Sequence, residues 1–526
     1  MKNSFKRAVC LLIAALMMTA SCFAQQTENV VADPVDDNFR TFYQIFVGSF
    51  SDSNNDGIGD LQGVINRFDY LNDGNMLSED SLGVQGIWLS PVFESPSYHK
   101  YDAVDYYRID PKFGTEEDLK ELIALCDQRN VKVILDLAIN HTSCWNEWFL
   151  KFKEARISGD TENPYYDYYS CVSEAEKASG ITYRKIDGVD WWYECNFSDD
   201  MPELNYDNPE VRQAMLEVAK YYLDLGVDGF RFDAVKYIYF GDTARSVAFW
   251  EWYMEELLKI DPDIYCVGEC WSGENEILEY YGAMNCFNFA MSQAEGTVAM
   301  AAKGFAVSKY TSYVTSFRNK LLQKNPEGMV MPFLSNHDMD RIAGAFVLEN
   351  NMRMAANLYL LCSGSPMIYY GEEIGIRGSR GSDNTDANRR LAMLWGDGDT
   401  VRNPIGASYP EKNQITTTVA DQMADANSLY RYYCRLLSIR HKYPAIARGD
   451  YEALKWSDRN LGGFCIGYEG ETFVLIHNTA AEETALDLSR IADYSISAVC
   501  DFIGMGEAEI EDGVLKLGPQ TSVILR

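Results

Sequence analysis

Basic residues are in short supply in this chain. Its 526 residues contain 46 Lys and Arg against 78 Asp and Glu, which gives a formal net charge of −32. A surface of that sign repels the phosphate backbone of nucleic acids and anionic lipid headgroups. The composition therefore argues against nucleic acid as a partner, and it is compatible with neutral sugars and with cations.

Long apolar segments are also lacking, and the one apolar run near the N-terminus is short. Ala8 to Thr19 follows the basic residues Lys2, Lys6 and Arg7. A basic start followed by about a dozen apolar residues is typical of an export signal and too short for a transmembrane helix. Residues 1–24 are therefore predicted to be a signal peptide.

Two processing routes fit this leader. One is an ordinary cut before Gln25, and the other is a lipoprotein-type cut that leaves a lipid on Cys22. The polar, acidic residues 25–38 then form a tether in either case. Both routes predict an extracytoplasmic protein, which is secreted, periplasmic or lipid-anchored at a bacterial surface. We expect no transmembrane segment and a monomer.

The 13 cysteines have no spacing that suggests a metal knuckle. Cys266 and Cys362 lie within apolar, strand-like runs and are expected to be small buried hydrophobic residues. Disulfides are possible among Cys144, Cys171 and Cys195, but the sequence alone does not show which cysteines pair.

Short apolar, β-rich runs alternate along the chain with longer amphipathic ones such as 116–128 and 209–225. The strand candidates are Phe42–Val47, Val84–Ser90, Val131–Ala138, Val227–Asp233, Ile264–Glu269, Asn285–Phe289, Val330–Ser335 and Pro366–Tyr370. Strands alternating with helices in this way favour an α/β fold, a (β/α)8 TIM barrel, with an open doubly wound sheet as the alternative.

Two stretches break this alternation. Residues 141–206 are rich in Trp, Tyr and turn residues and lack a helix–strand rhythm, which predicts an inserted domain after the third strand. Residues 450–526 carry short strand-like patterns, which predict a C-terminal β-sandwich. The barrel is then assigned to residues 39–140 and 207–449.

Acidic, His and Arg residues follow the ends of several predicted strands. They are His99 after the second, Asp136 and His141 at the third, Arg231 and Asp233 at the fourth, Glu269 at the fifth, and His337 and Asp338 after the seventh. In a barrel these strand ends meet on one face, where barrel active sites form. The alternative is a set of buried ion pairs that cap the barrel.

Converging carboxylates suit glycoside hydrolysis. One carboxylate must be ionised to attack the anomeric carbon, and another must be protonated to donate to the leaving oxygen. Arg231 and Asp233 are two residues apart, so in a strand both side chains point to the same face, where the cation favours the ionised carboxylate. Glu269 needs the opposite environment, with a pKa raised by partial burial and neighbouring negative charge.

Five short segments follow one another along the chain: Asp136–His141 (DLAINH), Met201–Asn205 (MPELN), Gly229–Lys236 (GFRFDAVK), Gly268-Glu269 and Phe333–Asp338 (FLSNHD). Together they resemble the α-amylase family, glycoside hydrolase family 13. Each segment is weak alone, but all five in the family's order are specific. The resemblance covers nearly the whole chain after the leader.

The resemblance implies a retaining mechanism. Asp233 matches the nucleophile, Glu269 the acid/base, and Asp338 the carboxylate that binds sugar hydroxyls and stabilises the transition state. The substrate-binding residues that it implies are His99, Tyr101, His141, Arg231, Lys236 and His337. For Tyr101 the alternative is ordinary packing.

A second motif lies after the first predicted strand. Oxygen-bearing residues alternate there around a glycine in the sixth position, as in the first nine positions of an EF-hand loop. The side-chain ligands would be Asp52, Asn54, Asp56 and Asp60, and Ile58 would supply its carbonyl. The resemblance to loops in relatives that bind Ca²⁺ implies a structural Ca²⁺ site, and the alternative is an acidic turn held by Asx hydrogen bonds.

Two features of the resemblance imply hydrolysis of α-1,4 bonds in starch and maltooligosaccharides: Ala234 follows the matched nucleophile, where α-1,6-specific relatives usually carry Val, and Lys236 matches a Lys that binds the leaving-side sugar in many α-amylases. Export favours the same activity, because polymeric starch is met outside the cell. The alternatives are a neopullulanase or cyclomaltodextrinase, which the MPELN segment resembles, and a 4-α-glucanotransferase. A non-catalytic glucan-binding protein is an alternative of another class, and the presence of all three carboxylates argues against it. Trp271, two residues after Glu269, is a candidate for a leaving-side subsite.

Overall fold

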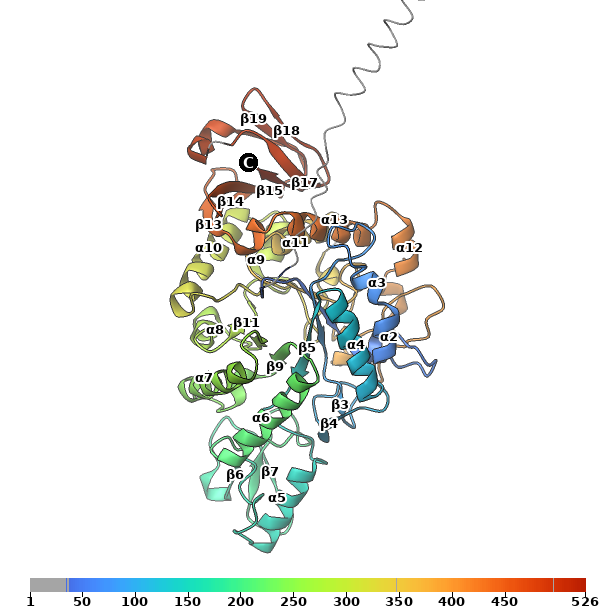
Figure 1. The fold of residues 1–526 in the computed structure, drawn as a ribbon, viewed down its shortest axis with the longest axis vertical. Helices are drawn as coiled ribbons and strands as arrows, with labels where there is room; N and C mark the ends of the chain where they lie inside the picture. Colours follow the sequence, from blue (N-terminus) through green and yellow to red (C-terminus); the bar gives the residue numbers. More distant parts are fainter. Residues whose placement is uncertain (1–34, 36, 347, 495) are drawn as a thin grey trace, which may run out of the picture. The chain divides into compact units, whose positions relative to one another are not determined.

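The computed structural model describes residues 35, 37–346, 348–494 and 496–526 (Figure 1). The expected signal peptide 1–24 with Cys22, and residues 25–34 of the expected tether, lie outside the described residues. In the described part of the chain, no helix combines the length and the apolar character needed to cross a bilayer.

A parallel sheet forms the centre of the fold. Its hydrogen-bonded order is β11-β10-β9-β5-β2-β1-β12. The bounds are β1 (Phe42–Ile45), β2 (Gly86–Leu89), β5 (Lys132–Leu137), β9 (Gly229–Phe232), β10 (Tyr265–Gly268), β11 (Asn285–Cys286) and β12 (Met367–Tyr369). Every residue of β1, β2, β9 and β10 is buried, as expected for parallel strands covered on both faces.

Isolated β-bridges connect the two edge strands of this sheet and close it into a barrel. Phe287, next to β11, pairs with Met331, and Phe333 pairs with Met367 of β12. Segment 331–333 therefore takes the place of the remaining strand. The (β/α)8 barrel predicted from the sequence is confirmed.

The prediction of a continuous strand over Val330–Ser335 is wrong, and the reason is Pro332. The amide of Met367 donates to the carbonyl of Pro332 at 3.0 Å, but proline has no N–H with which to continue the ladder. The backbone here makes isolated bridges instead of a ladder.

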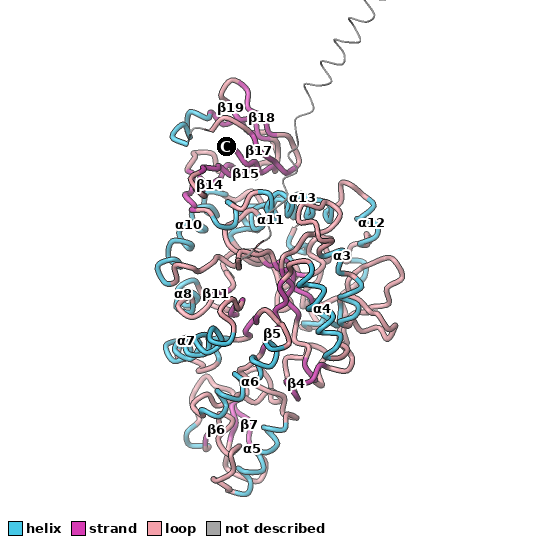
Figure 2. The backbone as a smooth tube through the Cα atoms, viewed as in Figure 1, coloured by secondary structure: helices cyan, strands magenta, loops and turns pink. Residues whose placement is uncertain are grey.

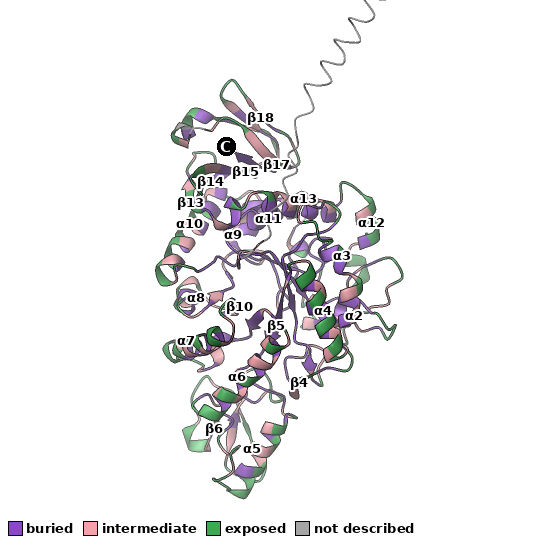
Figure 3. Cartoon of the chain, in the orientation of Figure 1, coloured by how far each residue is buried: buried purple, intermediate pink, exposed green. Residues whose placement is uncertain are grey.

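Helices surround the strands on the outside (Figures 1 and 2). They are α2 (Leu61–Asn66), α3 (Phe68–Leu71), α4 (Glu116–Gln128), α6 (Pro209–Asp224), α7 (Thr243–Ile260), α8 (Glu274–Tyr280), α9 (Thr297–Ala302), α10 (Val307–Lys324), α11 (Glu349–Leu360), α12 (Val419–Ala424), α13 (Leu429–Lys442) and α14 (Ala445–Arg448). Local signals fix their starts: a Thr115/Asp118 capping box begins α4, and the Asn208 cap followed by Pro209 begins α6. Buried faces of the helices point toward the strands (Figure 3).

Between β5 and α6 the chain forms helix α5 (Glu147–Ser158) and a small antiparallel sheet. The sheet has the order β6 (Cys171–Val172), β8 (Trp192–Glu194), β7 (Tyr183–Lys185). Asn146 caps α5, and Gly159 ends it with a left-handed backbone, φ 71°. Helix α5, whose apolar residues are spread around its circumference, was not identified from the sequence.

The C-terminal residues form two antiparallel sheets. One has the order β13 (Asp450–Leu454), β14 (Leu461–Tyr468), β15 (Glu471–Asn478), β20 (Thr521–Leu525), β17 (Val499–Gly504), and the other β16 (Thr484–Asp487), β19 (Val514–Leu517), β18 (Ala508–Glu511). Val474, Leu515 and Val523 belong to a buried cluster of their own. The amide of Asn357 in α11 donates to the Ile503 carbonyl at 3.1 Å, so the C-terminal sheets are tied to the barrel.

Candidate active site

The three carboxylates expected from the sequence follow neighbouring parts of the barrel. Asp233 comes directly after β9, Glu269 directly after β10, and Asp338 after segment 331–333. They line an open cleft of about 950 Å³. The other sequence-predicted residues that line this cleft are His99, Tyr101, His141, Lys236 and Trp271. Arg231 and His337 are fully buried beneath it.

Arg231 links two of the carboxylates through one guanidinium group. Its Nη1 donates to Asp233 Oδ1 and to Asp136 Oδ1, each at 2.7 Å, and its Nη2 donates to Glu269 Oε2. The alternation of side chains along β9 places Arg231 and Asp233 on the same face, as expected for residues two apart. One buried cation therefore holds Asp233 and Glu269 side by side.

The environment of Glu269 favours its protonated form. Burial raises the pKa of the Glu269 carboxyl to about 8, and the negative charges of Asp233 and Asp338 act in the same direction, while Arg231 opposes them. At neutral pH this carboxyl carries a proton that it can donate. The sequence also predicts a raised pKa for Glu269, in agreement with the structure.

Asp338 is held in the ionised form by two partners. Arg390 Nη2 donates to its Oδ1 at 2.7 Å, and His337 Nε2 lies 2.8 Å from its Oδ2. Burial alone would raise the pKa of Asp338, but His337 and Arg390 together lower it well below its usual range. Arg390 also donates to the Tyr98 hydroxyl and to the His337 carbonyl, each at 3.0 Å.

Arg390 was not identified from the sequence. It lies in the loop after β12, about twenty residues beyond the strand. Arg390 is therefore neither at a strand end nor in one of the five segments that resemble the family. Gln44 was missed as well, and here a signal existed. A Gln inside an otherwise apolar buried strand needs a polar partner, and its Nε2 lies 2.7 Å from His337 Nδ1.

Tyr101 is both a packing residue and a cleft residue. Its ring stacks on the ring of His337, with centroids 5.3 Å apart and planes 8° apart. Its hydroxyl lies 2.7 Å from Asp136 Oδ2 and 2.6 Å from His337 Nε2. The face of Tyr101 that His337 does not cover can meet a sugar ring.

The surroundings of two histidines at the cleft favour their neutral form. Burial, with help from Arg390, lowers the pKa of His99 to about 4, and burial lowers the pKa of His141. His141 Nε2 lies 3.2 Å from the Tyr101 carbonyl. A neutral imidazole has one donor and one acceptor nitrogen, which suits hydrogen bonding with hydroxyl groups.

A sharp turn follows the expected nucleophile. Ala234 has a left-handed backbone, φ 49° and ψ 42°, which is uncommon for a residue with a side chain and is found at functional sites. The next residue, Val235, donates its N–H to the Glu269 carbonyl at 3.1 Å. Lys236 follows in the short helix η3 (Val235–Tyr237) and donates its Nζ to the Trp271 carbonyl at 2.7 Å.

The predicted cation-binding residues lie together in the loop between η1 (Val47–Ser49) and α2. Gly57 has φ 92°, the turn that the sixth position requires. Asp52 Oδ2 accepts from the Gly57 N–H at 2.8 Å, and Asp60 Oδ1 accepts from the Gly63 N–H at 2.6 Å, which caps α2. The Asn54 amide donates to Asp60 Oδ2 at 3.3 Å.

The oxygen donors of this loop suit a hard cation such as Ca²⁺. In the described ranges, however, no group of three or more acidic, His or Cys side chains is already placed around a single point. Burial alone would raise the pKa of Asp52, but hydrogen bonds from Thr400 and from Gly57 lower it, which favours the ionised carboxylate. Binding would have to draw the flanking side chains inward.

Cys144, Cys171 and Cys195 carry free thiols in the structure, so the disulfides left open by the sequence do not form among them there. Cys266 and Cys362 are free and buried, as expected.

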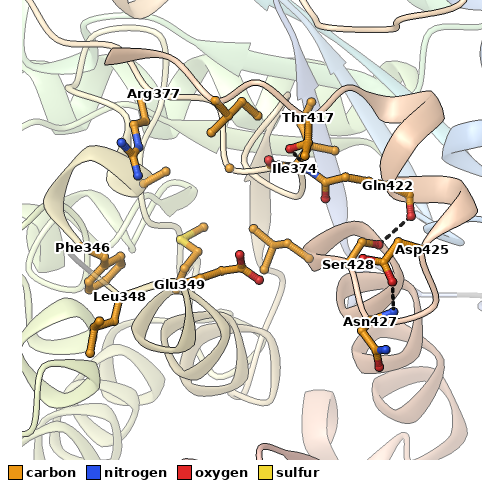
Figure 4. Close-up of a pocket in the computed structure, with 15 residues that line it drawn as sticks. Phe346, Leu348, Glu349, Ile374, Arg377, Thr417, Gln422, Asp425, Asn427 and Ser428 are labelled. Atoms are coloured by element: carbon orange, nitrogen blue, oxygen red, sulfur yellow. Dashed lines mark hydrogen bonds between the residues drawn. The ribbon is translucent and has the colours of Figure 1, made fainter. Parts of the chain in front are cut away.

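A second, smaller cavity lies away from the carboxylates. It has a volume of about 210 Å³ and lies beside the N-terminus of α11 and the segment that includes α12 (Figure 4). Its lining includes Leu348, Ile374 and Gln422 but none of the three carboxylates, so the site chemistry belongs to the larger cleft.

A closed parallel barrel with an arginine-linked carboxylate pair at its strand ends defines an enzyme of the barrel glycosidase class. Comparison with known proteins agrees. Residues 44–449 match the family described as Alpha amylase, catalytic domain. The chain therefore belongs to the alpha-amylase family, and it is a glycoside hydrolase or transferase of that family.

Individual relatives match over nearly the full length. The chain is 34% identical over 491 residues to Alpha-amylase 3 of Dictyoglomus thermophilum, with 92% of each chain covered. It is 30% identical over 472 residues to the 4-alpha-glucanotransferase of Thermotoga neapolitana, with 87% of this chain and 99% of that one covered. The solved structure of Eubacterium rectale Amy13B is 35% identical and superposes with a TM-score of 0.86, covering 94% of this chain and 97% of that one.

Proposed function

We propose that this protein is a retaining hydrolase that cleaves α-1,4-glucosidic bonds in starch and maltooligosaccharides. The observation that carries the proposal is the pair of carboxyls on one guanidinium: Asp233, which Arg231 contacts at 2.7 Å, and Glu269, whose pKa is raised to about 8. The first serves as nucleophile and the second as acid, and later as base. Asp338, held ionised by Arg390 and His337, stabilises the positive charge that develops on the sugar.

The spacing of the pair supports a retaining reaction. Two carboxyls that contact neighbouring nitrogens of one guanidinium lie close together. Retaining enzymes need a separation of about 5–5.5 Å, whereas inverting enzymes leave room for a water between carboxyls about 6.5–9.5 Å apart. The covalent intermediate then forms between Asp233 and the anomeric carbon, and Glu269 activates the water that releases it.

The proposed specificity is tested by following products from soluble starch, pullulan, cyclodextrin and isomaltose. We expect mixed maltooligosaccharides from starch, with little action on the other three. Dominant cleavage of pullulan or cyclodextrin would replace this proposal with a neopullulanase or cyclomaltodextrinase activity.

Glucanotransfer is the second candidate, because a relative named 4-alpha-glucanotransferase is matched over 99% of its length. A sugar acceptor and water compete for the same glycosyl intermediate. Products longer than the substrate, formed from maltotriose early in the reaction, would favour transfer over hydrolysis.

We also propose that the loop with Asp52, Asn54, Asp56, Ile58 and Asp60 binds a structural Ca²⁺, and that the protein works outside the cytoplasm. The alternating oxygen ligands and the Gly57 turn support the ion. Export is supported by the basic and apolar leader sequence.

Calcium is expected to raise the melting temperature. A ligand at a hundredfold excess over its Kd stabilises the folded state by about 2.7 kcal/mol, which corresponds to a rise of about 2–3 °C for a chain of this length. Asp52→Asn should abolish the rise, whereas Asp73→Asn, in another acidic loop, should retain it. Thermal melts with millimolar Ca²⁺ and with EDTA measure this, and an equal rise in Asp52→Asn would contradict the assignment.

A further inference from the structure

The ring of His337 is buried, and each of its two nitrogens has a partner within the protein. On one side, Gln44 Nε2 lies 2.7 Å from Nδ1. On the other side, Nε2 lies 2.6 Å from the Tyr101 hydroxyl and 2.8 Å from Asp338 Oδ2. Which ring nitrogen carries the proton therefore decides how all of these contacts are made.

The oxygen partners of the ring place the proton on Nε2. The Tyr101 hydroxyl donates to Asp136 Oδ2 at 2.7 Å, and because a hydroxyl has one hydrogen, it can only accept from His337. An ionised carboxylate such as that of Asp338 is also an acceptor only. Both contacts are hydrogen bonds if Nε2–H donates, and neither is one if Nε2 holds a lone pair.

The side-chain amide of Gln44 fits this arrangement from the opposite side of the ring. In a neutral imidazole with Nε2–H, Nδ1 is an acceptor, and the amide nitrogen of Gln44 can only donate. The position of Gln44 is fixed by the barrel, because β1 pairs there with Trp88 of β2 and with Tyr369 of β12. A proton on Nδ1 would set two donors against each other at this distance.

We propose that Gln44 is a positioning residue that fixes the Nε2–H tautomer of His337, and with it the donor that faces Asp338. This inference rests on the proposed function, in which Asp338 stabilises the charge that develops on the sugar. Gln44 is buried in β1 and does not line the cleft, so it acts only through His337.

The opposite tautomer would weaken the site in two places. A lone pair on Nε2 would face the carboxylate of Asp338 at 2.8 Å, which is unfavourable in a buried position. The Tyr101 hydroxyl would have to turn from Asp136 to donate to the ring instead. A change at Gln44 is therefore felt at Asp338 although the two residues belong to different parts of the barrel.

Two variants of Gln44 separate a donor from a space-filling residue. Gln44→Met keeps the length and removes the donor, and kcat/KM for maltopentaose should fall about tenfold, as for the loss of one buried hydrogen bond. Gln44→Glu supplies an acceptor that draws the proton to Nδ1, and kcat/KM should fall about a hundredfold.

Gln85→Met is the matched control. Gln85 is another buried glutamine, whose Oε1 accepts from the Thr41 amide at 3.0 Å just before β2 begins. We expect this variant to keep kcat/KM within about twofold of the wild-type value, since one peripheral hydrogen bond is lost far from His337. Thermal melts of all variants correct for any loss of folded protein.

Nuclear magnetic resonance of nitrogen-15-labelled histidine reads the tautomer directly. The chain has five histidines, and the His337 signals are those absent from His337→Gln. We expect a protonated Nε2 and an unprotonated Nδ1 in the wild type and in Gln85→Met, and a proton on Nδ1 in Gln44→Glu.

A wild-type His337 protonated on Nδ1, whether as the other tautomer or as an imidazolium, would overturn the role of Gln44. So would a changed tautomer in Gln44→Glu with unchanged kcat/KM. A wild-type protein that shows the expected tautomer but cleaves no maltopentaose would instead overturn the proposed function.

Discussion

Asp233→Asn is expected to lower kcat for maltooligosaccharide cleavage by about 10⁴-fold or more. The amide has nearly the size of the carboxylate, but it lacks the negative charge and the nucleophilic oxygen that the glycosyl intermediate requires. Arg231 would keep Asp136 and Glu269 as partners, so the barrel should stay folded. Initial rates at saturating maltopentaose, with circular dichroism as a check on folding, measure the effect.

The matched control for this change is Asp224→Asn at the end of α6, an exposed carboxylate paired only with Lys220. We expect it to retain wild-type kcat. Residual activity above about one part in a hundred in Asp233→Asn would be too high for loss of a nucleophile and would remove Asp233 from that role.

Glu269→Gln is expected to lower kcat/KM for maltooligosaccharides by about 10³-fold, within the range for loss of a general acid. In the wild-type protein, kcat/KM should fall about tenfold per pH unit above pH 8. The rate falls at high pH because burial raises the pKa of Glu269 to about 8. The donor is therefore protonated below that pH and ionised above it. The variant has no proton to lose there, and its rate should not show this alkaline fall.

A substrate that needs no acid separates this role from a structural one. Fluoride leaves without a proton, so kcat/KM for α-maltosyl fluoride should fall less than about tenfold in Glu269→Gln, because the acid's contribution is absent from that step. Glu274→Gln, which removes only an ion pair with Lys320, serves as the control. Equal losses on the fluoride and on maltooligosaccharides would contradict an acid role for Glu269.

Strand-end residues are the part of the site that sequence reasoning predicts best. A run of buried β-rich residues ends at Phe232 and another at Gly268, and the charged residue that follows each run has to emerge at the same end of a parallel barrel. The sequence alone therefore predicts that Asp233 and Glu269 lie close together. Asp338 follows in the same way once the motif Phe333–Asp338 is recognised.

Other features depend on contacts between residues that are distant in sequence. Arg390 reaches Asp338 from a loop that no periodic pattern describes, so only the folded chain shows it. Helix α5 has no apolar face that a periodicity search would detect. Pro332 is different, because the sequence does indicate the interruption: proline lacks the N–H that a ladder needs. The predicted strand Val330–Ser335 ignores this.

Pro332 also determines how the three carboxylates are held. Asp233 and Glu269 continue from β9 and β10, which pair with each other over their full length. Asp338 instead follows isolated bridges, and its position depends on side chains: Arg390 from the loop after β12, and His337, which Gln44 contacts from β1. Asp233 and Glu269 are thus positioned by paired backbone strands, whereas Asp338 is positioned by side-chain contacts. We therefore expect the distance from Asp338 to the other two carboxylates to change more on sugar binding than the distance between Asp233 and Glu269.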